Sequence, residues 1–118
     1  MTFIKINENL YPATIIGKVA DKDWDNRASK SITLEMTYAE AIVLFVDGLA
    51  WSIIQREEVP TFDEEGNEIG TEMRETEFDN RDYNLAGDIT DHRDGTITVK
   101  MGKLTELEEA YEIMLGGI

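Results

Sequence analysis

The segment Ser31-Ile32-Thr33-Leu34-Glu35-Met36-Thr37-Tyr38-Ala39-Glu40 decides the class of fold, because a strand pattern changes within it to a helix pattern. Its apolar residues up to Met36 alternate with polar residues, as in a strand that buries one face. Thr37 and Glu40 then have the spacing of a capping box, which starts a helix. A strand that leads directly into a helix, in a chain of short strands, predicts an α+β fold.

The first helix is expected to follow Thr37 and to end before Asp47-Gly48, because glycine tolerates the left-handed conformation that closes a helix. Ala41, Ile42 and Phe45 form an apolar stripe at helical spacing, so they should face the core. A helix of only about three turns depends on tertiary packing for its stability.

A second helix is predicted after Thr105, where Glu108 completes another capping box. It should end at Gly116-Gly117. Its apolar residues recur at the spacing i, i+3, i+4, i+7 and i+8: Leu107, Ala110, Tyr111, Met114 and Leu115. We expect both helices to lie buried on one face of the sheet, with three aromatic residues in the core: Phe45, Trp51 and Tyr111.

Short strands are predicted on both sides of the first helix: Phe3–Ile6, Ala13–Ala20 (with Ile15 and Val19 on one face), Ser31–Met36, Leu49–Gln55 (with Trp51 and Ile53 on one face), Tyr83–Thr90 and Thr96–Met101. Turns are expected at Asn7-Glu8-Asn9 and at Asp94-Gly95, where two strands meet as a hairpin. Strands joined by hairpins favour a mainly antiparallel sheet. The whole chain, 1–118, is therefore predicted to be a single α+β domain with two short helices.

Composition excludes several classes of site. The 118 residues include 25 acidic and 11 basic side chains, a formal net charge of −14, and 42% are hydrophobic, which is enough for a compact core. The absence of cysteine excludes disulfides, thiolate metal sites and cysteine nucleophiles, and a single histidine excludes a multi-histidine zinc site. The negative charge disfavours direct binding to nucleic acid and to anionic membranes.

The acidic residues are concentrated between Glu57 and Asp82, where eleven of them face only Arg74 and Arg81. This stretch also contains Pro60 and the turn-prone run Asp63-Glu64-Glu65-Gly66-Asn67. We expect an acidic β-hairpin that protrudes from the core, with its tip near Gly66. The alternative is a mobile loop without a role.

Two clusters of carboxylates are candidates for metal or catalytic sites. Asp21, Asp23 and Asp25 alternate as in a calcium loop, but Asn26 and Ile32 stand where glycine and glutamate are needed. The alternative is a polar connection between strands.

The second cluster comprises Asp88, Asp91, His92 and Asp94, which could hold a divalent metal or support acid–base chemistry. Such residues are also the ordinary composition of a turn. We therefore predict no enzyme and no catalytic, cofactor or metal site, and leave cation binding by either cluster open. The candidates for contact with a partner are Tyr11, Phe62, Asp63, Glu64, Glu65, Glu68 and Tyr83.

One four-residue pattern occurs twice, as Trp24-Asp25-Asn26-Arg27 and as Phe78-Asp79-Asn80-Arg81. The interpretation is a shared turn, in which Asp and Asn bond the local backbone and the aromatic residue anchors the turn in the core. Duplication is the alternative.

Three segments resemble small proteins of phages and prophages of Gram-positive gut bacteria, encoded near tail and lysis genes: Trp24–Arg27, Leu44–Ile53 and Gly87–Thr96. The resemblance covers most of the chain. It implies a phage origin and carries over no functional residue.

From these observations we expect a non-enzymatic structural or accessory phage protein, associated with the tail, that acts through protein–protein contacts. The alternative is an acidic anti-defence inhibitor that occupies the basic, nucleic-acid-binding groove of a host protein. Either would be found in the host cytoplasm or the virion, with no signal peptide and no transmembrane segment. The partner is another virion protein or a basic host protein, and a homo-oligomer is left open.

Overall fold

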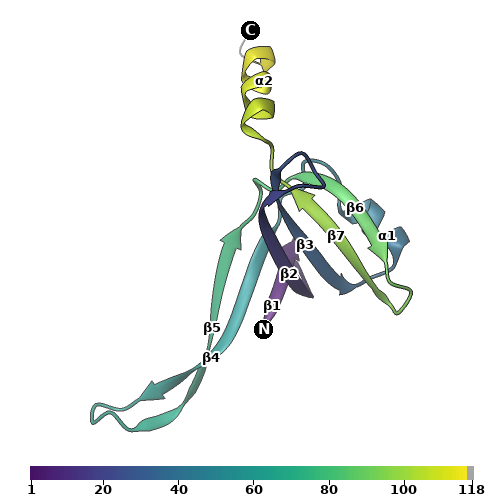
Figure 1. Cartoon of the computed structure of the whole chain (residues 1–118). Coiled ribbons are helices and arrows are strands. Elements are labelled where there is room, and N and C mark those ends of the chain that lie inside the picture. Colours follow the sequence, from purple (N-terminus) through teal and green to yellow (C-terminus); the bar gives the residue numbers. More distant parts are fainter. Residues whose placement is uncertain (117–118) are drawn as a thin grey trace.

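The computed structural model describes residues 1–116, which form one sheet and two helices (Figure 1). In chain order the elements are β1 (Thr2–Ile6), β2 (Asn9–Asp21), β3 (Arg27–Glu35), α1 (Tyr38–Leu44), β4 (Ser52–Phe62), β5 (Glu68–Asp79), β6 (Leu85–Asp91), β7 (Thr96–Gly102) and α2 (Glu106–Gly116). The strands follow the order β5-β4-β1-β2-β3-β7-β6, and all neighbours are antiparallel. The mainly antiparallel α+β fold is thereby confirmed.

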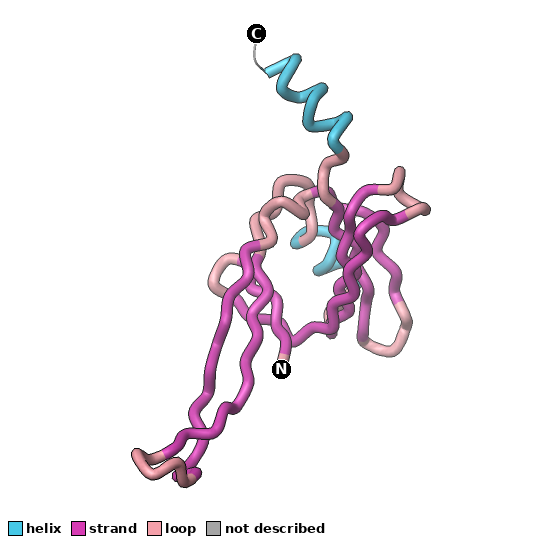
Figure 2. The backbone as a smooth tube through the Cα atoms, turned by 60° about the vertical axis from the view of Figure 1, so that its left-hand side comes forward, coloured by secondary structure: helices cyan, strands magenta, loops and turns pink. Residues whose placement is uncertain are grey.

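Tight turns join neighbouring strands where the sequence predicts them. Asn7 and Glu8 have φ values of 49° and 72° and close the β1–β2 hairpin, as two-residue turns with positive φ do. Gly95, with φ of 92°, lies in the β6–β7 turn. β2 pairs with two neighbours: residues 9–12 pair with β1, and residues 13–18 and Asp21 pair with β3. In Figure 2 the β4–β5 hairpin and the remaining strands diverge from each other.

The core lies between α1 and the buried face of the central strands. Its side chains come from β1, β3, β7 and α1, from the residues that directly follow β3 and α1, and from the loop before β4: Ile4, Ile6, Ile32, Leu34, Met36, Ala41, Phe45, Trp51, Ile97, Val99 and Met101. The alternation predicted for β3 is confirmed, because Ile32 and Leu34 are buried there. Trp51 also donates its indole N–H to the carbonyl of Tyr83 at 2.9 Å, which connects the start of β4 to the segment before β6.

Helix α1 begins as predicted and is shorter than predicted. The Thr37 hydroxyl accepts a hydrogen bond from the amide of Glu40 at 3.1 Å, and the helix ends at Leu44. Ala41 and Phe45 are buried, but Ile42 is 48% exposed, so its assignment to the core face is wrong. Ile42 is rotated by about 100° from Ala41, and a helix of two turns contacts the sheet with only one narrow edge.

The strand bounds differ from the predicted ones mainly at β2 and β4. Val19, expected beside Ile15 on a buried face, is 94% exposed. The register between β2 and β3 shifts between Lys18 and Asp21, and this irregularity breaks the alternation of faces. In β4, Trp51 precedes the strand, and Ile53 packs against the same core as Trp51, as predicted. Ile54, on the next position of the strand, is also buried.

The position of helix α2 contradicts the predicted two-layer sandwich. Within residues 1–116, α2 packs against no other helix or strand and projects from the end of the sheet (Figure 1). Leu107 and Tyr111 are 79% and 62% exposed, and Ala110, Met114 and Leu115 are also exposed, so Tyr111 is not a core residue. Of the predicted helix end, Gly116-Gly117, the second glycine lies outside the described residues. No helix among residues 1–116 is long and apolar enough to cross a membrane.

Candidate functional site

Two exposed elements extend from the sheet, the β4–β5 hairpin and helix α2. β4 pairs with β1 only through Ser52–Gln55, whereas its pairing with β5 continues to Phe62 and Glu68. Beyond this shared base, the outer part of the hairpin, residues 57–74, has no other neighbour in the sheet; we call it the arm. It gives the molecule a long axis of 62 Å (Figure 1).

The base of the arm is fixed by paired charges. Arg56 donates to Glu75 at 2.7 Å, and the Arg56 guanidinium lies 4.9 Å from the centre of the Phe3 ring. Lys5 of β1 lies 3.4 Å from Glu77 of β5. These contacts hold the first part of the hairpin against β1, and they end where the arm begins.

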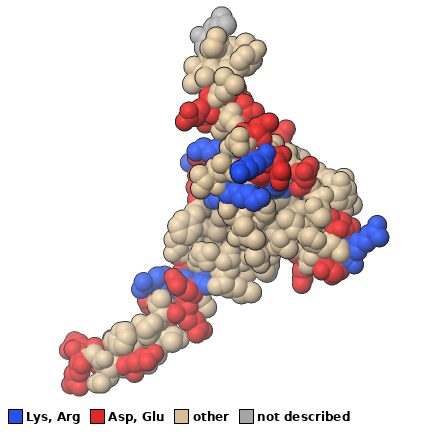
Figure 3. Space-filling model, in the orientation of Figure 1, with Lys and Arg blue, Asp and Glu red and all other residues tan. Residues whose placement is uncertain are grey.

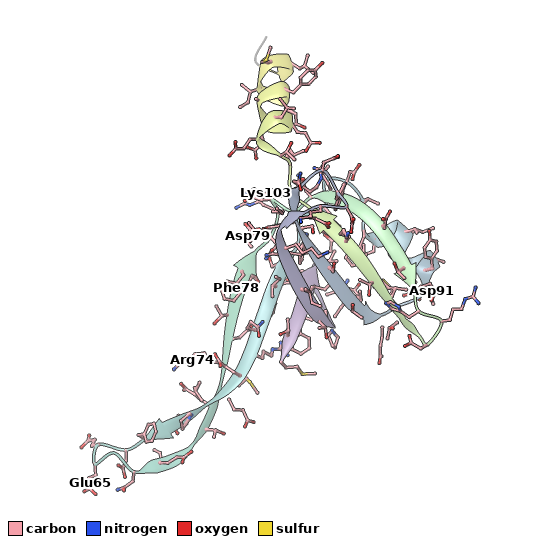
Figure 4. The ribbon with its side chains drawn as sticks, viewed as in Figure 1. Glu65, Arg74, Phe78, Asp79, Asp91 and Lys103 are labelled. Atoms are coloured by element: carbon pink, nitrogen blue, oxygen red, sulfur yellow. The ribbon has the colours of Figure 1, made fainter. Side chains whose placement is uncertain are left out.

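The turn at the tip is organised by Asp63. Its carboxylate accepts hydrogen bonds from the amides of Glu65 and Asn67, both at 2.9 Å. Bonds from Asn67 and Glu65 hold the pKa of Asp63 below its usual range. Gly66 supplies the positive φ of 86° that the turn requires. Asp63 is therefore engaged in the turn, while Glu64, Glu65 and Glu68 are exposed around it (Figure 4 labels Glu65 at the tip).

The arm has two chemically different faces. Ile69, Thr71 and Met73 share one face of β5 because side chains alternate along a strand, and the residues opposite Thr71 and Met73 are Pro60 and Glu58. Ile69 and Met73 are 67% and 62% exposed, and Phe62 near the tip is 58% exposed. A two-stranded ribbon thus leaves an apolar face without cover.

The other face of the arm is charged. Glu72 and Arg74 share this face of β5, and Glu57 lies opposite Arg74. A register shift next to the tip places Glu68 opposite Phe62 instead. Arg74 is 3.4 Å from Glu72 and is the only basic residue among seven acidic ones in the arm. Figure 3 shows the resulting red surface at the outer end of the molecule, interrupted by uncharged atoms.

Tyr11 and Tyr83, the two remaining contact candidates, lie away from the arm. Tyr11 is half-buried opposite Ile4 and lines an open cleft with residues of α1. Tyr83 is half-buried, and Lys30 Nζ lies 4.4 Å from the centre of its ring. The structure therefore brings together only five of the seven candidates, all at the tip: Phe62, Asp63, Glu64, Glu65 and Glu68.

The side chains around Asp21 stabilise the fold. Asp21 is fully buried, and its carboxylate contacts Lys100 Nζ at 2.9 Å and accepts a hydrogen bond from Ser29 at 3.0 Å. The bond from Lys100 lowers its pKa to about 2. Asp23 and Asp25 are exposed in the following turn. Among residues 1–116, no three His, Asp or Glu side chains are grouped to hold a metal ion.

The cluster around His92 likewise stabilises a turn. Asp91 accepts from the amide of Arg93 at 2.9 Å, and Asp94 accepts from the amide of Thr96 at 2.9 Å. His92 Nε2 lies 2.7 Å from the hydroxyl of Thr98. These side chains are exposed, and Figure 4 places Asp91 at the far end of β6, remote from the arm.

The repeated aromatic-Asp-Asn-Arg pattern adopts two different structures. Asp25 and Asn26 have φ values of 55° and 58°, whereas Asp79 and Asn80 do not have positive φ. Phe78 is more than half exposed, so it does not anchor its turn in the core. The interpretation as one shared turn is therefore wrong. The predicted local bonds do occur in the second copy: the amide of Arg81 donates to Asp79 at 3.0 Å, and the Asn80 side chain donates to the carbonyl of Phe78 at 2.9 Å.

In the first copy, the aromatic residue does act as an anchor. Trp24 lies against Gly87 and Gly102, at distances that leave no room for a side chain at either position. Arg27 stacks on Trp24, with its guanidinium carbon 5.0 Å from the ring centre. This packing brings the buried Arg27 to the point where the chain leaves β7 for α2.

Helix α2 is joined to the sheet through Arg27 and Glu108. Arg27 Nη1 donates to Glu108 Oε1 at 2.6 Å and to the carbonyl of Lys103 at 3.2 Å. Glu108 also accepts from the amide of Thr105 at 2.8 Å, which confirms the predicted capping box. The apolar stripe from Leu107 to Leu115, which its spacing predicts to face the core, is exposed and forms a second candidate surface.

No protein-family model matches the chain, and the comparisons with curated proteins and with solved structures found no match.

Proposed function

We propose that the chain is a non-enzymatic interaction module, an accessory protein of a phage particle that associates with the tail. The observation that carries this proposal is the arm, an extended ribbon with an exposed apolar face formed by Pro60, Ile69 and Met73. The phage context comes from the resemblance of Trp24–Arg27, Leu44–Ile53 and Gly87–Thr96 described above.

The physical argument concerns the stability of the arm. A two-stranded hairpin in water is marginally stable alone, and clustered exposed apolar residues mark interaction surfaces. A partner that covers Ile69 and Met73 would remove apolar area from water, which favours association. The carboxylates of the charged face would set the orientation of this contact rather than most of its affinity.

The test is incorporation into particles. Residues 57–74 are replaced by Asn-Gly, a two-residue turn that joins the paired Arg56 and Glu75 and keeps the base of the hairpin. Mass spectrometry of purified particles should detect the full chain and should not detect the armless chain at equal expression. Absence of the full chain from particles would overturn the proposal.

A second candidate function follows from the charge of the arm. An acidic inhibitor would present the carboxylates of Glu64, Glu65, Glu68 and Glu72 to a basic groove in place of phosphates. Such binding would weaken strongly with salt. The two candidates respond to different variants.

Neutralising carboxylates of the tip and of β5 with Glu64→Gln, Glu65→Gln, Glu68→Gln and Glu72→Gln should abolish binding by an inhibitor and leave incorporation into particles largely intact. Changing the apolar face with Ile69→Thr and Met73→Thr should have the opposite effect, since threonine suits a strand but removes most of the apolar surface. Capture of a basic host protein, lost only in the first variant, would favour the inhibitor.

A further inference from the structure

We propose that helix α2 is a docking helix whose apolar stripe inserts into an apolar groove with a rim of lysine or arginine on a partner protein. This inference deepens the proposed function as an interaction module, because it states the chemistry of one partner. It concerns a surface separate from the arm.

The first observation is that the stripe is uncovered. Leu107, Tyr111, Met114 and Leu115 recur on one side of α2, and each is more than 60% exposed. Within residues 1–116 no other element packs on this helix. A polar helix would be expected to lie exposed, but α2 is not polar on this side: its apolar stripe is as wide as that of a helix that packs on a core.

The second observation is that α2 is short. It has 11 residues, and isolated helices of this length are marginal in water because nucleation is unfavourable. Only its first turn is supported, by the Thr105–Glu108 capping box and by Arg27. A groove that receives the stripe would supply the packing that the rest of the helix lacks, as in other helix-in-groove complexes.

The third observation fixes the charge of the partner. The side of α2 opposite the stripe carries Glu106, Glu109 and Glu112, and the helix contains no basic residue. Figure 3 shows acidic atoms near the base of α2 and uncharged atoms over its outer part. A groove rimmed by basic side chains would attract these carboxylates, whereas a second copy, with a net charge of −14, would repel them.

The test uses a synthetic Leu/Lys peptide as the probe, designed so that its leucines share one helical face and its lysines flank them. Fluorescence anisotropy at physiological ionic strength should show binding to the full chain. Leu107→Gln with Met114→Gln should weaken binding by about tenfold or more, the effect of losing at least 1.4 kcal/mol. Glutamine keeps helix propensity close to that of leucine and methionine.

Ile113→Gln is the matched control. Ile113 is 73% exposed, but it lies on the acidic side of α2, so the same change of chemistry should leave binding within about twofold of the unmodified chain. Equal weakening by both variants, or none by either, would overturn the proposal. Equal binding of a Leu/Glu peptide would overturn the requirement for a basic partner.

Two further measurements identify other occupants of the stripe. Sedimentation velocity that shows a dimer lost only in the Leu107→Gln, Met114→Gln variant would assign the stripe to a second copy instead. Sedimentation with phosphatidylcholine vesicles, lost in the same variant, would assign it to a lipid surface. Particle incorporation is measured independently, so its failure would overturn the proposed function without affecting the peptide result.

Discussion

Glu108 forms a bidentate pair with Arg27: Nη1 lies 2.6 Å from Oε1 and Nη2 lies 3.1 Å from Oε2. The same carboxylate caps the amide of Thr105. A single side chain thus closes the first turn of α2 and ties that turn to the sheet. Because Arg27 is itself held by the stacked ring of Trp24, the direction in which α2 leaves the sheet is determined by packed residues.

We predict that acid releases the start of α2. The bond from Arg27 lowers the pKa of Glu108 to about 2, below the value of about 4.3 for an unfolded chain. The stabilisation is therefore complete above pH about 4.3 and is lost as the pH falls toward 2. NMR chemical shifts of Leu107 and Glu109 should move toward coil values over this range.

Glu108→Gln is expected to give the less helical shifts already at neutral pH. Glu109→Gln, an exposed position in the same turn, should leave the shifts and their pH dependence as in the unmodified chain. A helix start that persists in Glu108→Gln would contradict the role assigned to the Arg27–Glu108 pair.

We predict that Gly102→Ala destabilises the fold. A Cβ at this position would lie 2.6 Å from the Trp24 ring and 2.8 Å from Cδ of Arg27. Gly102 is buried at the end of β7 and Arg27 is buried beside it, so an added methyl would have to displace the Trp24 ring from its place against the strand. Overpacking of this kind costs about 1–3 kcal/mol, which urea denaturation would detect.

Gly17→Ala is the control for this substitution. Gly17 also lies in a strand of the sheet, β2, but its Cβ would meet Lys30 Cγ at an ordinary 4.0 Å. We expect a change within about 0.5 kcal/mol. Similar losses in the two variants would show that loss of strand glycine, rather than the Trp24 contact, is responsible.

The sequence predicts local structure better than the position of α2. The N-cap at Thr37, the capping box at Thr105 and the turn at Asn7-Glu8 depend on neighbouring residues only, and all three are present in the structure. At Thr37 only the bond from the Glu40 amide to the hydroxyl is formed, which is half of the predicted box. An apolar stripe, in contrast, predicts that one side of a helix will be covered, but it does not identify the element or the protein that covers it. The spacing of Leu107 and Tyr111 is the same whether these side chains pack on the sheet of their own chain or on a partner protein.

Errors at single residues have similar causes. Val19 follows the strand period, but the irregular register near Asp21 turns it outward. Ile42 has the helical spacing of a core residue, but α1 is so short that only one side of it is buried, and Ile42 lies beside that side. Among the contact candidates, the position of the tip of the arm could be predicted from the acidic and turn-forming residues. The apolar face with Ile69 and Met73 could not, because it depends on the register of β4 and β5, which composition does not provide.

We predict that Asp21 and Lys100 stabilise the fold as a pair. Asp21→Asn leaves the ammonium of Lys100, which is 22% exposed, without its charged partner, and should lower the urea midpoint. Adding Lys100→Met should recover part of the loss, since replacing both members of a buried pair is better tolerated than removing one. Additive losses in the double variant would contradict coupling between the two residues.

We predict that the arm opens independently of the sheet. Its backbone pairs only within β4 and β5, and beyond Arg56 it has no neighbour in the sheet that could protect it. Hydrogen exchange measures such local opening. Amides of residues 57–74 should exchange much faster than those of β3 and β7, whose side chains form the core.

The armless chain should retain the free energy of unfolding of the full chain within about 0.5 kcal/mol in urea denaturation, because no core residue is removed. Slow exchange in the arm, equal to that of β3, would mean that the ribbon is stable without a partner and would remove the physical reason for assigning it to an interface.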